Sequence, residues 1–195
     1  MKEKFNLRRE YEKSWEFIKE SKNFIYLSIL VFIAFALLGF FLPTPSGISE
    51  KILVFLVELL ELTKGMGAGE LTWFIFSNNL KSSLLGILGG IVLGIFPFIS
   101  SLLNGYVVGF VGKVGVMEAG PLILWRLVPH GIFELPAIFI SFGLGMKFGT
   151  FVFKKKRLEA FRDYFWNSIR VFVLVVLPLL IIAAIIEGSL IAFAA

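Results

Sequence analysis

Long apolar blocks alternate with short charged clusters along the chain. A helix needs about 20 apolar residues to cross the hydrocarbon core of a membrane, and charge between such blocks is typical of polytopic membrane proteins. We therefore predict an all-α fold, a polytopic membrane helical bundle with about five transmembrane helices. The five blocks are Phe24–Leu42, Leu71–Ile99, Leu102–Val116, Pro129–Phe148 and Ser168–Ile186.

Two further segments have helical patterns but do not qualify as spans. Residues Asn6 to Glu20 mix apolar and charged positions at helical spacing, which predicts an amphipathic helix at the membrane surface. Residues Ile48 to Leu62 are apolar but short and contain Glu58 and Glu61. That segment is predicted to be an interfacial or re-entrant helix on the far side.

The distribution of basic residues predicts the orientation. The N-terminal arm has seven Lys or Arg, and the segment after the fourth block contains the cluster Lys154 to Arg157. Because cytoplasmic flanks are enriched in Lys and Arg, both regions are expected in the cytoplasm and the C-terminus outside. Five crossings give the same arrangement. We expect a cytoplasmic amphipathic arm at 1–22 and one transmembrane domain at 23–195 in the cell membrane.

Composition agrees with a membrane protein and narrows the possible partners. The chain is 57% hydrophobic, and its mean hydropathy is +0.88. The net charge of +5 is explained by the flanks of the apolar blocks, so membrane lipids rather than nucleic acid are the expected partners. The chain has no cysteine, which excludes disulfides and thiolate metal sites. It also lacks glutamine and is rich in Lys and Glu, as in thermophiles.

The segment VPHGIFELP, residues 128–136, places the single histidine four residues before a glutamate within an apolar block. Ionisable groups at membrane depth cost a few kcal/mol each on insertion scales, so their positions are informative. Pro129 favours a helix that starts nearby, with His130 and Glu134 on one face. The candidate ligand or structural polar cluster comprises Asn79, Lys81, Asn104, Arg126, His130, Glu134 and Glu187.

Three roles for this cluster are open. The polar groups can lock the bundle by hydrogen bonds between helices, which is the simplest role. They can instead line a cavity for a head group or a proton. A metal site is the least favoured, because one His and one Glu supply two ligands where zinc needs at least three from the protein. We expect no catalytic residues, no metal and no cofactor.

Glycines recur at four-residue spacing in three blocks. The pairs are Gly90 with Gly94, Gly105 with Gly109, and Gly145 with Gly149. Small residues at this spacing let helices approach closely. The contacts can form within one chain or between two, and their abundance leads us to expect a homodimer.

Several motifs together resemble the stage II sporulation protein M family of integral membrane proteins. They are PHGIFELPA followed by GLGMKFG, FSNNLKSS, LLNGYVVG and the closing IEG. The similarity runs from about Asn6 to Gly188. The matched positions are Asn79, Asn104, Gly105, His130, Gly131, Glu134, Pro136 and Glu187.

The resemblance implies a function without catalysis. In spore-forming bacteria the family is implied in the membrane complex that drives engulfment, alongside cell-wall hydrolases, and members occur in archaea and in bacteria that do not sporulate. It therefore implies a scaffold-like protein, not an enzyme, that organises other membrane proteins. The alternative is a transporter or lipid translocator with a polar site at the broken helix. An intramembrane metal-dependent hydrolase is the third possibility.

Overall fold

The structure is a computed structural model that describes residues 6–194, with side chains at 6–125 and 131–187. All regular structure in this part of the chain is helical, so the predicted all-α class is confirmed. The α-helices are α1 (Leu7–Glu20), α2 (Lys22–Phe41), α3 (Ser46–Thr63), α4 (Ala68–Leu88), α5 (Ile95–Ala119), α6 (Val128–Gly149), α7 (Arg157–Val171) and α8 (Leu177–Ala194). Shorter helical segments are η1 (Gly89–Ile91), η2 (Pro121–Leu127), η3 (Thr150–Phe153) and the π-helical η4 (Phe172–Val176).

Helix α1 is the predicted amphipathic helix. The side chain of Asn6 accepts a hydrogen bond from the backbone N–H of Arg9 and so caps the first turn. At the other end, the hydroxyl of Ser21 donates to the carbonyl of Phe17 at 2.6 Å. Phe17 is buried against the bundle, whereas Leu7 and Trp15 are exposed. Helix α1 therefore packs with one face and leaves a second apolar stripe uncovered.

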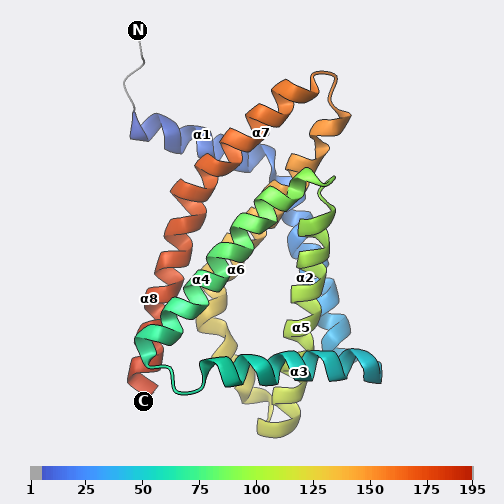
Figure 1. Cartoon of the computed structure of the whole chain (residues 1–195), viewed down its shortest axis with the longest axis vertical. Helices are drawn as coiled ribbons and strands as arrows, with labels where there is room; N and C mark the ends of the chain where they lie inside the picture. Colours follow the sequence, from blue (N-terminus) through green and yellow to red (C-terminus); the bar gives the residue numbers. More distant parts are fainter. Residues whose placement is uncertain (1–5, 195) are drawn as a thin grey trace.

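Among the residues that the structure describes, four helices are long and apolar enough to cross a membrane. They are Lys22–Phe41, Ile95–Ala119, Gly131–Phe153 and Arg157–Glu187. Helix α4 runs beside α6 and α8 in Figure 1, but the polar stretch at residues 77–83 lowers its hydropathy. A membrane location follows from the four apolar helices, and a fifth crossing by α4 stays a prediction.

The expected boundary between the second and third blocks is wrong. The chain turns at Gly89–Gly94 instead of near residue 100, and α5 begins at Ile95. Leu93 and Gly94 have φ angles of 54° and 71°, which a helix does not tolerate and which reverse the chain. This turn carries no charged residue, so hydropathy alone cannot locate it. The fifth apolar block lies within a longer continuous helix, Arg157–Glu187, whose first part is the charged beginning of α7.

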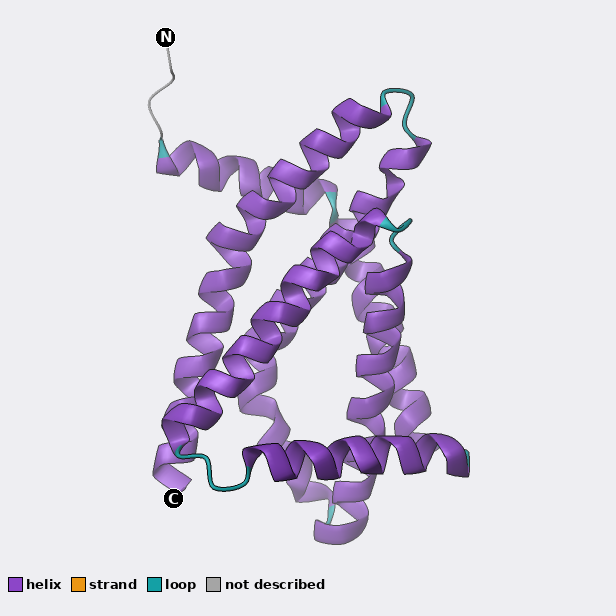
Figure 2. Ribbon diagram, viewed as in Figure 1, coloured by secondary structure: helices purple, strands orange, loops and turns teal. Residues whose placement is uncertain are grey.

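The connections gather at the two ends of the bundle (Figure 2). Helix α3 lies across the end opposite to α1 and to the α6–α7 connection (Figure 1). It is almost wholly exposed, and only Ile52 is buried. The predicted short helix is therefore present, and its location in the membrane interface stays a prediction.

One apolar core is shared by several helices of the molecule. Phe17 of α1 belongs to the same cluster as residues of α4, α6 and the α7–η4–α8 helix. The buried members are Phe17, Ile87, Ala137, Leu144, Val171, Phe172, Val176 and Leu180. Helix α1 is thus part of the folded body.

The predicted glycine pairs make close contacts between helices of the same chain. A Cβ on Gly105 or Gly109 would collide with the α2 carbonyls of Phe32 and Ala36. A Cβ on Gly145 would collide with the carbonyl of Gly86, and one on Gly149 with the amide of Gly94. Close helix approach therefore explains these glycines in a single chain. The homodimer stays a prediction, and these glycines do not support it.

Candidate functional site

Three of the predicted polar residues meet between α4, α6 and α8. Asn79, Glu134 and Glu187, one from each helix, line a single cavity of about 10 Å³. The rest of its wall is apolar and comprises Ile75, Phe76, Leu180, Ala183 and Ala184. Residues from three distant parts of the sequence thus form one polar point inside an apolar bundle.

The size of this cavity limits its chemistry. A cavity of about 10–15 Å³ holds about one water molecule. Glu187 is 7% exposed, and both Glu187 and Glu134 have interaction partners. The arrangement can hold a proton or a water between the helices, but it has no room for an organic substrate.

The start of α6 determines where Glu134 points. The 3₁₀ helix η2 ends at Leu127, and α6 begins at Val128, so Pro129 falls in the first turn, where its missing N–H breaks no helical hydrogen bond. Pro136, inside α6, cannot donate to the carbonyl of Ile132. Both prolines flank the turn that carries Glu134. Arg126 and His130 lie outside the described side chains, so their place in the cluster stays a prediction.

Lys81 and Asn104 do not line this cavity. Both side chains are exposed. Lys81 follows Asn79 by two positions, which turns it to the opposite side of α4. The amide of Asn104 donates to the carbonyl of Ser100 in its own helix at 2.7 Å. The two-residue spacing from Asn79 already indicates this for Lys81, whereas the direction of Asn104 depends on how α5 packs against the other helices.

An ion pair outside the predicted set joins the exposed Glu20 of α1 to the buried Lys147 of α6. The ammonium of Lys147 lies 3.1 Å from the carboxylate of Glu20 and 3.9 Å from the centre of the Phe17 ring. Lys147 is 5% exposed. The signal was present in the sequence as a lone lysine in the apolar, glycine-rich run GLGMKFG. An ionisable group in an apolar run is expected to pair with a specific partner.

A second ion pair fixes the other half of α1. The carboxylate of Glu10 accepts hydrogen bonds from Lys13 and from Arg170 of α7, and Arg170 also donates to Asn167. The hydrogen bonds from Lys13 and Arg170 lower the pKa of the Glu10 carboxyl from its ordinary value. Helix α1 is therefore attached to the bundle through Glu10 and through Glu20.

The described residues gather no group of three side chains that could hold a metal ion. His130, which was the candidate metal ligand, lies outside that search. With two carboxylates, one amide and an apolar wall, the cavity has the composition of a polar contact between helices.

Comparison with known families agrees with this architecture. The sequence profile of Stage II sporulation protein M matches residues 28–190. The chain belongs to the stage II sporulation protein M family. The match runs from within α2 through α3–α7 to most of α8, and it includes all three residues of the polar cavity. The resemblance drawn from the sequence motifs is confirmed.

Two relatives from the archaeon Methanocaldococcus jannaschii illustrate the family. The first, "Uncharacterized protein MJ0793", is 34% identical over 123 residues, which are 58% of this chain and 66% of the relative. The second, "Uncharacterized protein MJ0706", is 29% identical over 148 residues, 69% of this chain and 62% of the relative. The chain thus matches a little under two thirds of the length of these family members. No solved structure matches it.

Proposed function

We propose that this member of the stage II sporulation protein M family is a non-enzymatic membrane scaffold that organises other membrane proteins. The cavity of about 10 Å³ between Asn79, Glu134 and Glu187 carries the proposal. Polar groups packed around space for one water hold helices in place, whereas a transported molecule needs an open path.

Close backbone packing supports the same role. Glycines at positions 39, 105 and 109 bring α2 and α5 together, and those at 86, 90 and 145 bring α4 and η1 against α6. Interfaces of this type have little freedom to slide. A rigid bundle presents its surface in a constant arrangement, which is what a scaffold requires.

The connection between α6 and α7 is the surface we assign to a protein partner. Figure 1 shows that it projects beyond α1, at the end opposite to α3. Phe153 and Leu158 are 79% and 85% exposed there, on either side of the basic residues Lys154 to Arg157. Exposed apolar groups beside positive charge favour an acidic partner with apolar side chains.

Site-specific photocrosslinking in cells tests the scaffold. A photoreactive residue at Leu158 should give a discrete protein adduct, and reversing the charges of Lys154, Lys155 and Lys156 to Glu should abolish it. The matched control carries the photoreactive residue at Leu30, which is 65% exposed on α2 and expected to face lipid. Adducts to lipid alone at both positions would contradict the proposal.

A lipid translocator is the second candidate, favoured by one observation. An apolar groove of about 260 Å³ between α4 and α8 shares Phe76 and Ala184 with the wall of the small polar cavity. Movement of the Phe76 ring would connect the two. Phe76→Ala should then accelerate the exchange of fluorescent lipid between leaflets of proteoliposomes, whereas Phe55→Ala on α3 should not. Equal rates for both variants and the parent protein contradict translocation.

A further inference from the structure

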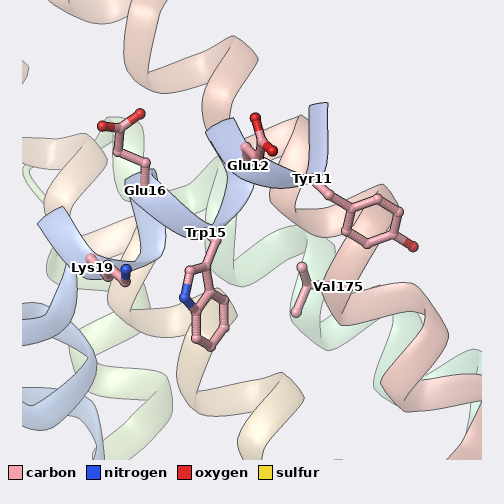
Figure 3. Close-up of a pocket in the computed structure, with 6 residues that line it drawn as sticks. All are labelled: Tyr11, Glu12, Trp15, Glu16, Lys19 and Val175. Carbon is pink, nitrogen blue, oxygen red and sulfur yellow. The ribbon is translucent and has the colours of Figure 1, made fainter. Parts of the chain in front are cut away.

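The space beneath α1 is an open groove that neither the scaffold nor the polar cluster accounts for. Its volume is about 610 Å³. Tyr11, Glu12, Trp15, Glu16 and Lys19 of α1 form one side, and Val175 of η4 forms another. Figure 3 shows this groove in close-up.

The position of α1 over this groove is fixed. Ion pairs from Glu10 to Arg170 and from Glu20 to Lys147 attach the helix to α7 and α6. Phe17 is buried between them at 4% exposure. The groove is therefore formed by a helix that is attached to the bundle near both of its ends.

Polarity changes across the groove from one side of α1 to the other. In Figure 3 the carboxylates of Glu12 and Glu16 lie on one side of α1, and the indole of Trp15 lies on the opposite side, toward the level of Val175. Leu7, Tyr11 and Trp15 follow each other at four-residue spacing and are 52%, 46% and 57% exposed. They form one apolar stripe that the protein leaves uncovered.

This polarity gradient has a defined direction in a membrane. Val175 lies within the candidate span Arg157–Glu187, and Trp side chains concentrate at the boundary between hydrocarbon and head groups. The apolar side of the groove thus opens toward acyl chains and the charged side toward water. An occupant must be an amphiphile with the same orientation.

The charges at the rim of the groove limit which lipid head groups can bind there. Glu12 is paired with Arg8 at 3.0 Å. Glu16 and Lys19, three positions apart and both exposed, enter no ion pair with the described residues. In Figure 3 the carboxylate of Glu16 lies on the same side of α1 as Glu12, whereas the ammonium of Lys19 lies on the side of Trp15, nearer the apolar part of the groove. A zwitterionic head group carries the complementary phosphate and amine.

We propose that the groove beneath α1 binds one phospholipid with a primary amine in its head group. The acyl chain lies against Trp15 and Val175, the phosphate pairs with Lys19, and the ammonium donates to Glu16. A primary ammonium has three N–H donors, whereas a trimethylammonium group has none. The site therefore distinguishes phosphatidylethanolamine from phosphatidylcholine.

Quenching of tryptophan fluorescence by brominated acyl chains measures this binding directly. The probe is a variant that keeps Trp15 and carries Trp73→Phe, Trp125→Phe and Trp166→Phe, placed in nanodiscs of phosphatidylcholine. A small fraction of lipid with brominated chains is added as phosphatidylethanolamine, phosphatidylcholine or phosphatidylglycerol. We expect phosphatidylethanolamine to quench more strongly than the other two at equal mole fraction.

Variants of the two rim charges test the head-group contacts. An exposed ion pair changes an equilibrium by about two- to fivefold. Lys19→Gln and Glu16→Gln should each lower the preference by that factor. Lys22→Gln is the matched control, because Lys22 is exposed one turn further along but does not line the groove. Retention of lipid by the parent protein in native mass spectrometry provides a measurement without tryptophan substitutions.

Four outcomes overturn the proposal. Equal quenching by phosphatidylethanolamine and phosphatidylcholine means that the groove meets bulk lipid only. Preference for phosphatidylglycerol contradicts the pairing with Glu16. An equal effect of Lys19→Gln and Lys22→Gln contradicts a localised phosphate contact. Loss of the preference in the presence of inorganic phosphate assigns Lys19 to free phosphate instead of a lipid.

Discussion

The ammonium of Lys147 lies 3.1 Å from the carboxylate of Glu20, a residue 127 positions earlier in the chain. The Lys147 side chain is 7% exposed, whereas that of Glu20 is 62% exposed. The ammonium also faces the ring of Phe17 at 3.9 Å. A nearly buried cation on α6 thus depends on a carboxylate at the water-exposed end of α1.

This difference in exposure predicts that substitution of Glu20, the exposed partner, destabilises the protein more than substitution of Lys147. Glu20→Gln leaves the buried ammonium without its anion and should cost about 1–3 kcal/mol of stability. Lys147→Met replaces the cation with an apolar chain of similar length and should cost less. Thermal unfolding in detergent and protease cleavage within 7–20 measure both effects. Glu12→Gln is the control, and greater damage from Lys147→Met would contradict the explanation.

The glycine contacts make a prediction that two positions of one helix can test. A Cβ at Gly109 would collide with the carbonyl of Ala36, whereas at Gly112 its nearest neighbour is a Leu124 methyl group at 3.4 Å. We expect Gly109→Ala to destabilise the protein by about 1–3 kcal/mol. Gly112→Ala should be neutral or stabilising, because Ala favours helix by about 1 kcal/mol. If the unfolding curves of the two variants in detergent coincide, the close approach of α5 to α2 at Gly109 does not determine stability.

The polar cavity makes Glu134 sensitive to the loss of hydrogen bonding. Glu134→Gln keeps donors and acceptors and should melt like the parent. Glu134→Leu should strand the polar groups of Asn79 and Glu187, at a cost of about 1–3 kcal/mol. Asn104→Leu is the matched control, since its amide bonds only within its own helix. If Glu134→Leu melts like the parent, the cluster does not lock the helices.

Hydrogen bonding to Glu10 predicts that the contact of α1 with α7 weakens in acid. The folded pKa of Glu10 is lowered by its bonds from Lys13 and Arg170, relative to an ordinary value of 4.5. Its contribution is therefore fully present above pH 4.5 and is lost as the pH falls through the lower folded value. Trp166 lines a groove with Glu10 and Arg170, so its fluorescence in a single-tryptophan variant reports the change. Glu10→Gln should flatten the pH dependence of Trp166 fluorescence. A curve that is unchanged by Glu10→Gln would contradict the predicted role of Glu10.

Topology is testable because the chain has no cysteine. Helix α3 and the α6–α7 connection lie at opposite ends of the molecule (Figure 1). Single cysteines at Lys155 and Glu61 should therefore react with impermeant thiol reagents from opposite sides of the membrane, with Lys155→Cys protected in intact cells. Reaction of both from the same side would contradict the predicted orientation.

The sequence predicted features that follow from periodicity and failed where a feature depends on contacts. Helix α1 and the apolar spans are visible as patterns of hydrophobic residues. The turn at Leu93 and Gly94 was missed because it is apolar and its positive φ angles are set by packing against α6. Asn79, Glu134 and Glu187 were selected for their polarity alone.

The same selection by polarity included Lys81 and Asn104, which face outward, and omitted Lys147, which is buried. The relative directions of residues within a helix follow from their spacing, but which side of the helix meets the core is decided by its packing against other helices. The ion pair of Lys147 with Glu20 also joins segments whose proximity no local pattern records.

The apolar turn between α4 and α5 bears on how the protein is made. Gly94 lies against the backbone of Met146, and Gly149 lies against Gly94, so the turn is held by the last part of α6. Helices α4 and α5 are synthesised before that part of α6. The hairpin must therefore wait in the bilayer or its insertion machinery until α6 arrives. A chain that ends at Ala119 and is released from the ribosome should expose this incompletely packed hairpin to chaperones and proteases.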